Sequence, residues 1–325
     1  MSEWVSTFPG YSLLMSRIKK VIGSVSRTGP VPRHIGLIMD GNRRFAKNHQ
    51  IELKEGHNMG FDSMAAVLEL LYESGVSCAT VYAFLIENFK RLKTEVDWLM
   101  DLAKSKLMQI SQNGELCDKY GIRVRILGNF AFLPDDVNVV LKDIMHTTRK
   151  NTRATLNVCF PYTSRDEMAH AIRTTAEDAN KDSGLDVDEH TLTDHMYTAG
   201  LPPLDLLIRT SGTYRLSDFL LWQCVPSLCA IVFSDRLWPE FTPWDMTKIL
   251  FMWSFNKYWY GHGNGQTMRR VVDEPLVRAM DRTDLAQSLW DSDASASPTA
   301  TSTGYKVYAS SPSDASDITA ASVVS

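Results

Sequence analysis

The sequence predicts an α/β fold with a mainly parallel central sheet of about six strands flanked by helices. Two patterns support this prediction. Short apolar runs recur along the chain, and most are continuous, as in strands that are covered on both faces. Longer amphipathic stretches separate these runs, and strands joined by connections of helix length pair in parallel.

Six segments are the candidate strands. In chain order they are residues 35–39, 79–84, 123–127, 154–160, 204–208 and 229–234. Helical patterns lie between them, for example over residues 63–74 and 95–120. Ligands of such sheets bind beyond the carboxyl ends of the strands, so we expect the segments that follow the strands to carry the function.

Three parts of the chain differ in character. Residues 1–33 form an amphipathic segment and a linker, residues 34–290 form one domain, and residues 291–325 form a tail rich in Ser, Ala and Thr that we expect to be disordered. Within the first part, residues 11–22 combine helically spaced apolar side chains with basic ones. Such a helix either lies in a membrane interface or docks on the protein's own surface, and both alternatives stay open.

The composition excludes several classes of protein. With 34 Lys and Arg against 38 Asp and Glu, the net charge is -4, which argues against a general nucleic-acid binder. Five scattered cysteines without a C-x-x-C pair form neither a disulfide framework nor a zinc site, so we expect free thiols. No segment has the length and apolarity of a membrane span, and no secretory signal is recognisable.

The segment after the first candidate strand reads Asp40-Gly41-Asn42-Arg43-Arg44. A strand that opens into a helix through such a turn presents backbone N–H groups to a phosphate, and the two arginines add charge. Asp40 amid these cations is suited to holding Mg²⁺, which binds through one or two carboxylates together with substrate phosphates. The alternative is that the tripeptide Asp-Gly-Asn is only a turn and helix cap.

A second loop follows the second candidate strand and contains Asn88 and Arg91. Asn88 could orient a substrate, and Arg91 could reach a phosphate. The alternative is a solvated helix start with ordinary surface charges.

The third group of residues follows the fifth candidate strand. Arg209 ends an apolar strand, where a guanidinium needs an anionic partner. Arg215 and Ser217 follow across a loop of small residues, so the three side chains could clamp a diphosphate. The alternative is that Arg209 pairs internally with Asp205 or Asp218.

Two further features leave alternatives open. His57 is either a catalytic or a structural histidine. The aromatic and Met-rich stretch over residues 241–260 is core or a subunit interface, with an apolar ligand channel as the other interpretation. Together, the loops predict two adjacent phosphate sites and one Mg²⁺ carboxylate, and therefore transfer or condensation of substrates that carry diphosphate groups.

Several of these motifs resemble one known family. They lie within residues 34–46, 55–57, 81–91, 205–223 and 237–241. In this order they are similar to the signatures of the cis-prenyltransferases, the undecaprenyl diphosphate synthase family, over nearly all of residues 34–260. Residues 153–162 and 197–205 are most similar to the fungal dehydrodolichyl diphosphate synthases.

The resemblance implies repeated condensation of isopentenyl diphosphate onto farnesyl diphosphate with cis geometry, which gives a long-chain polyprenyl diphosphate for dolichol synthesis and protein glycosylation. It further implies that Asp40 holds the Mg²⁺ ion and that Asn88 positions isopentenyl diphosphate for proton loss. The implied contacts to the allylic diphosphate come from Gly41, Asn42, Arg43, Arg44, His57 and Arg91, and those to isopentenyl diphosphate from Arg209, Arg215 and Ser217. The alternative is a non-catalytic or short-chain subunit of the same family.

The chain departs from the family pattern at several places. Leu85 and Leu53 replace residues that are Ser and Arg in many members, and residues 224–233 lack the carboxylate that supplies a second metal ligand in bacterial homodimers. An R-x-G triplet is absent after Phe241. Relatives without that triplet pair with a non-catalytic subunit similar to the Nogo-B receptor. The resemblance therefore implies a heteromer, placed peripherally on the cytoplasmic side of the endoplasmic reticulum membrane or on lipid droplets.

Overall fold

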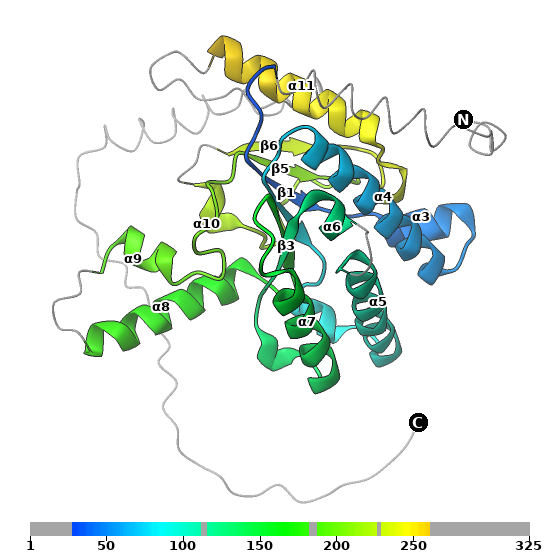
Figure 1. The fold of residues 1–325 in the computed structure, drawn as a ribbon. Helices are drawn as coiled ribbons and strands as arrows, with labels where there is room; N and C mark the ends of the chain where they lie inside the picture. Colours follow the sequence, from blue (N-terminus) through cyan, green and yellow to red (C-terminus); the bar gives the residue numbers. More distant parts are fainter. Residues whose placement is uncertain (1–27, 112–115, 182–186, 226–228, 261–325) are drawn as a thin grey trace, which may run out of the picture. The chain divides into compact units, whose positions relative to one another are not determined.

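Six parallel strands form one sheet in the order β3-β4-β2-β1-β5-β6 (Figure 1). They belong to a computed structural model that describes residues 28–111, 116–181, 187–225 and 229–260. The strands are β1 (His34–Ile38), β2 (Cys78–Tyr82), β3 (Ile122–Leu127), β4 (Ala154–Cys159), β5 (Leu206–Arg209) and β6 (Ala230–Phe233). The predicted parallel sheet of six strands is confirmed, with ends that differ from the prediction by at most two residues.

Helices separate the strands, as the amphipathic stretches predict. The longer ones are α3 (Asn42–His49), α4 (Leu53–Glu73), α5 (Lys93–Ser111), α7 (Asp135–Thr148), α8 (Ser164–Lys181) and α11 (Pro243–Tyr260). The shorter ones are η1 (Ile86–Lys90), α6 (Leu116–Tyr120), η2 (Phe130–Phe132), α9 (Glu189–Asp194), α10 (Leu221–Cys224) and η3 (Trp238–Glu240). The helical pattern predicted over residues 95–120 corresponds to two helices, α5 and α6.

The sheet has an apolar cluster on each face. Because successive side chains of a strand point to opposite faces, Ile35 and Leu37 of β1 join a large cluster with α4, α5, α7 and α11. Ile38 of the same strand joins a smaller cluster that includes Phe219 and Leu220. Helices α8, α9 and α10 lie together, away from α4 and α11 (Figure 1). Covering both faces explains why the strands are continuously apolar.

The strand order determines which loops meet. Strand β1 lies between β2 and β5, although β5 is separated from it in the sequence by the three intervening strands. The chain runs from β1 to β2 in one direction and returns to β5 on the other side. In parallel sheets, ligands bind at the carboxyl ends of the strands where the order reverses. The loops after β1, β2 and β5 therefore share one edge.

Helix α11 carries most of the aromatic stretch 241–260. Met246, Leu250 and Trp253 are buried in the large cluster, whereas Phe255 and Trp259 are exposed. The interpretation of this stretch as core therefore holds for one side of the helix. No residue of 241–260 lines the cavity at the carboxyl ends of β1, β2 and β5, so the interpretation of this stretch as a ligand channel is wrong for that cavity.

All five cysteines are free thiols, as predicted. Among the described residues, no helix combines the length and the apolar character that crossing a membrane requires. The amphipathic segment 11–22 and the tail 291–325 lie outside the described residues.

Candidate active site

A cavity of about 480 Å³ opens at the carboxyl ends of β1, β2 and β5. All eleven site residues predicted from the sequence line it. They are Asp40, Gly41, Asn42, Arg43, Arg44, His57, Asn88, Arg91, Arg209, Arg215 and Ser217. These residues come from the three segments that follow β1, β2 and β5 and from one further helix, α4, so the fold brings four separated stretches of sequence to one cavity.

The start of α3 lies in close contact with α4, and glycines make this contact possible. Gly41 precedes the helix with φ 114°, a left-handed conformation that residues with a Cβ rarely adopt. On α4, a Cβ at Gly60 would lie 2.2 Å from Oδ1 of Asn42, and one at Gly56 would lie 3.0 Å from the backbone oxygen of Asn42. The two glycines therefore let α4 pack directly against the first residue of α3. The turn-and-cap interpretation of Asp-Gly-Asn and the phosphate interpretation are both compatible with this arrangement, because the first N–H groups of a helix have no partners within it.

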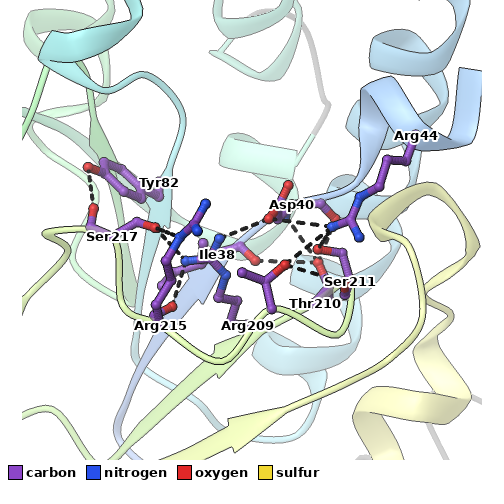
Figure 2. A network of polar contacts seen from close by, with 10 residues as sticks. Ile38, Asp40, Arg44, Tyr82, Arg209, Thr210, Ser211, Arg215 and Ser217 are labelled. Carbon is purple, nitrogen blue, oxygen red and sulfur yellow. Dashed lines mark hydrogen bonds and ion pairs between the residues drawn. The ribbon is translucent and has the colours of Figure 1, made fainter.

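Asp40 and Arg209 form an ion pair across the junction of β1 and β5 (Figure 2). Nη2 of Arg209 donates to Oδ2 of Asp40 over 2.9 Å, and Nη2 of Arg44 lies 3.7 Å from the same oxygen. Burial alone would raise the pKa of Asp40, but the hydrogen bond and charge of Arg209, assisted by Ser211 and Arg44, lower this pKa below its usual value. Asp40 is therefore an anion at neutral pH.

The partner of Arg209 differs from the alternatives that the sequence left open. Asp205 accepts hydrogen bonds from the backbone N–H groups of Arg33 and His34, and Asp218 pairs with Arg165. Pairing of Arg209 with Asp205 or Asp218 is therefore wrong. The side chain of Arg209 is only 4% exposed, so its buried charge needs compensation by Asp40 and by hydrogen bonds to the loop that follows β5.

That loop wraps around the Arg209 guanidinium. Nη1 of Arg209 donates to the backbone oxygen of Arg215 over 2.5 Å and to Oγ of Ser217 over 2.7 Å, and Nε of Arg215 donates to the same Oγ over 3.2 Å. Figure 2 shows these three residues beside Tyr82, whose hydroxyl donates to the backbone oxygen of Ser217 over 3.1 Å. The two cations are thus fixed around one serine, and the binding of a diphosphate by these three residues stays a prediction.

The same loop has a strained backbone. Ser211, Ser217, Asp218 and Leu220 all have positive φ, between 48° and 80°. Each such residue costs about 1–3 kcal/mol, and the strain persists only where surrounding contacts determine the conformation. Residues held in this way are concentrated at functional sites. Ser211 was not among the predicted site residues, yet its hydroxyl accepts a hydrogen bond from Arg44.

His57 is a neutral histidine that faces the cavity from α4. Burial, together with the nearby charges of Arg91 and Arg43, lowers the pKa of His57 to about 4. Its Nε2 atom is buried and has no hydrogen-bond partner among the described residues. A buried polar atom without a partner is costly, which suggests that a ligand supplies the partner.

Asn88 lies on η1 and Arg91 follows that short helix, so both extend from the end of β2. The Arg91 side chain is mostly buried and donates to Glu95 over 2.8 Å. The interpretation of this loop as a solvated helix start is therefore wrong for Arg91, which contributes to the charge around His57.

Part of the cavity wall is apolar, and no sequence motif marks it. Phe61 and Met64 of α4 and Leu99, Ala103 and Leu107 of α5 line it. Lys106, also a lining residue, places its Nζ 4.8 Å from the centre of the Phe61 ring. These residues occupy ordinary positions of amphipathic helices. Only the relative placement of α4 and α5 turns them into a channel.

A Mg²⁺ ion would fit beside Asp40 together with the phosphates of a substrate. Asp40 is a partly exposed carboxylate on the cavity wall. Within the part of the chain that the structure describes, no group of three or more His, Cys, Asp or Glu side chains could hold a metal ion. One carboxylate is nevertheless enough when substrate oxygens complete the coordination, as is common for Mg²⁺.

The fold and the cavity define an α/β protein with two groups of cations at the carboxyl ends of its strands. A family model described as putative undecaprenyl diphosphate synthase matches residues 38–261. The chain therefore belongs to the undecaprenyl diphosphate synthase family, the cis-prenyltransferases, as the sequence motifs predicted.

Individual relatives support this assignment. The chain is 41% identical to a dehydrodolichyl diphosphate synthase complex subunit of Schizosaccharomyces pombe over 252 residues, which cover 77% of this chain and 95% of that protein. It is 42% identical to the corresponding human subunit over 246 residues, 74% of this chain and 73% of that protein. The solved structure of lavandulyl diphosphate synthase from Lavandula x intermedia with dimethylallyl diphosphate has a TM-score of 0.63 and 27% identity, covering 69% of this chain and 95% of that one.

Proposed function

We propose that this chain is the catalytic subunit of a dehydrodolichyl diphosphate synthase. It condenses isopentenyl diphosphate with farnesyl diphosphate repeatedly and in cis, and gives a long-chain polyprenyl diphosphate for dolichol synthesis. The observation that carries the proposal is the cavity itself, where two groups of cations adjoin one apolar channel. Substrates that combine a diphosphate with a prenyl chain match both parts.

The allylic diphosphate binds at the start of α3. The free N–H groups of that helix, the side chains of Arg43 and Arg44, and Arg91 supply positive charge, and His57 offers its unpartnered Nε2. Because His57 is neutral at pH 7, it donates a hydrogen bond through Nε2 only in the tautomer that carries the proton there.

Isopentenyl diphosphate binds at the loop after β5. Arg209 and Arg215 already meet at the Ser217 hydroxyl, so little reorganisation is needed when the diphosphate arrives. Arg209 has a buried Nε atom without a partner among the described residues, which leaves it a donor for this ligand.

The reaction breaks the bond between the allylic carbon and oxygen, and the electron pair leaves with the diphosphate. The double bond of isopentenyl diphosphate forms the new carbon–carbon bond, and loss of a proton restores a double bond. The arginines and the helix N–H groups stabilise the negative charge that develops on the leaving group. When bound at Asp40, Mg²⁺ neutralises part of that charge. Asn88 positions isopentenyl diphosphate for proton loss.

The apolar channel holds the growing chain. Phe61, Leu99 and Leu107 present only hydrocarbon to it, so they exclude water from a reacting centre that water would capture. The chain lengthens toward α4 and α5 while the diphosphates stay at the sheet edge.

A partner subunit and a membrane surface complete the proposal. Relatives from fission yeast and human are complex subunits, which supports a heteromer with a non-catalytic subunit similar to the Nogo-B receptor. An apolar product supports a peripheral position on the cytoplasmic side of the endoplasmic reticulum membrane or on lipid droplets.

The test is incorporation of labelled isopentenyl diphosphate into lipid, with farnesyl diphosphate and Mg²⁺, for this chain alone and with such a subunit. We expect incorporation with the partner, loss of activity on chelation of Mg²⁺, and a ladder of long products. No incorporation under either condition would refute the enzymatic function, and full activity of the chain alone would remove only the requirement for a partner.

A further inference from the structure

The strained loop of Ser217 rests on the first residues of α8. The backbone N–H of Ser164 donates to the backbone oxygen of Asp218 over 2.8 Å, and the Ser164 hydroxyl accepts from the N–H of Leu221 over 2.9 Å. The Asp218 carboxylate accepts from the backbone N–H of Arg165 over 3.2 Å and from its Nε over 2.7 Å. Asp218 thereby caps α8 from outside the helix, where a negative charge is favourable.

The same arginine reaches the opposite side of the site. Nη2 of Arg165 donates to Oε1 of Glu87 over 2.9 Å. Glu87 precedes Asn88 on η1, the segment that follows β2. Arg165 therefore joins the segments that follow β2 and β5, and β1 lies between those two strands in the sheet.

None of Arg165, Asp218 and Glu87 lines the cavity, so these residues do not touch a substrate bound there. The side chains of Arg165 and Asp218 differ in their exposure to solvent. The Arg165 side chain is 72% exposed, whereas that of Asp218 is 14% exposed. Ion pairs with such an exposed partner contribute little to global stability. Their effect is local, because the Asp218 backbone is strained and adjoins Ser217.

We propose that Arg165 is a positioning residue that, through Asp218 and Glu87, holds the Ser217 loop and the Asn88 segment in one fixed relative arrangement. The inference rests on the proposed function and assigns to α8 a role in isopentenyl diphosphate binding. The planar guanidinium is suited to this role because its fork contacts two carboxylates at once, which an ammonium group does less well.

Arg165→Gln and Asp218→Asn test the proposal in the active complex. Asn keeps the size of Asp218 and tolerates the left-handed backbone, so this variant removes only the charge. We expect each change to raise KM for isopentenyl diphosphate about tenfold and to leave KM for farnesyl diphosphate within about twofold, since Arg43, Arg44 and His57 have no contact with Arg165. The double variant should have about the same KM for isopentenyl diphosphate as each single variant, because the effects of substitutions within one hydrogen-bond network do not add.

Lys181→Gln is the matched control. Lys181 pairs with Asp178 near the other end of α8 and is similarly exposed. We expect its KM values to equal those of the wild type, and its unfolding midpoint to match that of Arg165→Gln within about 2 °C, since both ion pairs are exposed. Arg165→Lys should give an intermediate KM for isopentenyl diphosphate.

Unchanged KM values, or equal rises in both of them, would overturn the positioning role. If the wild-type complex shows no prenyl transfer, the proposed function fails separately. Binding of inorganic diphosphate by calorimetry then decides the inference, with weaker binding by Arg165→Gln supporting it and equal binding overturning it.

Discussion

Asp40 and Arg209 are the residues on which the site most depends. Both side chains are charged and partly buried, and they form an ion pair with 2.9 Å between Nη2 of Arg209 and Oδ2 of Asp40. The arrangement places one anion among several cations, so it can accept both a diphosphate and the metal ion that accompanies it. In a site that bound anions alone, this carboxylate would serve only to compensate the buried charge of Arg209.

Replacing Asp40 by Asn should therefore abolish most of the activity while preserving the fold. Asn keeps a hydrogen-bond acceptor for Arg209 but loses the charge that, in the proposed function, would hold Mg²⁺. We expect kcat to fall about 100-fold or more, which is typical when a group directed at developing charge is removed. Steady-state kinetics measure this effect. Asp143→Asn, an exposed change on α7, serves as the control. Wild-type rates in the Asp40 variant would contradict the mechanism.

His57 should make the stability of the protein depend on pH. Its pKa is about 4 in the folded protein against the ordinary 6.5, so between these values the unfolded chain binds more protons than the folded one. Stability contributed by neutral His57 is therefore complete above about pH 6.5 and declines as the pH falls toward 4. The shift corresponds to about 3 kcal/mol at most.

Urea unfolding between pH 7 and pH 4 checks this expectation. The wild type should lose more stability over this range than His57→Gln, and the difference should develop between pH 6.5 and 4. His146→Gln, which changes an exposed histidine, should follow the wild type. Parallel curves for the wild type and His57→Gln would show that His57 titrates normally.

At the scale of elements, the start of α3 depends on Gly41. A Cβ at this position would lie 3.0–3.1 Å from Leu237, and its φ of 114° is strained for any other residue. We expect Gly41→Ala to lower the free energy of unfolding by about 1–3 kcal/mol. Gly200→Ala is the control, because its φ is also positive at 74° but no atom lies within 4 Å of the added Cβ. Thermal unfolding of both variants separates the backbone strain at positive φ from the collision with Leu237. An equal loss of stability in the two variants would show that the positive φ alone causes it.

Helix α5 should control the length of the product. Ala103 lines the apolar channel, so Ala103→Phe fills space that a growing chain would occupy. We expect a shift of the product ladder to shorter chains with little change in the rate of the first condensation. Ala176→Phe, on an exposed position of α8, should leave the ladder unchanged. Chromatography of labelled products measures both. An unaltered ladder for Ala103→Phe would place the growing chain elsewhere.

The helices and strands can be predicted from the sequence because their signals are local. Continuous apolar runs marked the strands, and all eleven predicted site residues line the cavity because each follows a strand or lies in a nearby helix. Contacts between elements that are far apart in the sequence have no such local signal. The alternative that paired Arg209 with Asp205 or Asp218 is wrong. The partner is Asp40, which lies 169 positions away and is brought to Arg209 only by the placement of β5 beside β1. Arg165 resembles any exposed arginine until its two carboxylate partners are known.

For the whole molecule, the order of the strands creates the site. Because β1 is central, the loops after β2 and β5 lie on either side of it, and the two groups of cations adjoin the same cavity. The large apolar cluster beneath α4 and α5 fixes the channel relative to those cations. In the proposed function, two diphosphates and one growing chain would have separate places within reach of one another, which is the geometry that a condensation requires.

A structure of the complex with a farnesyl thiodiphosphate, which reacts slowly, together with isopentenyl diphosphate and Mg²⁺ tests this claim most directly. We predict that the thiodiphosphate contacts Arg43, Arg44 and His57, and that isopentenyl diphosphate contacts Arg209, Arg215 and Ser217, with the farnesyl chain directed between α4 and α5. Binding of both diphosphates outside this cavity, or of only one substrate at a time, would contradict the account.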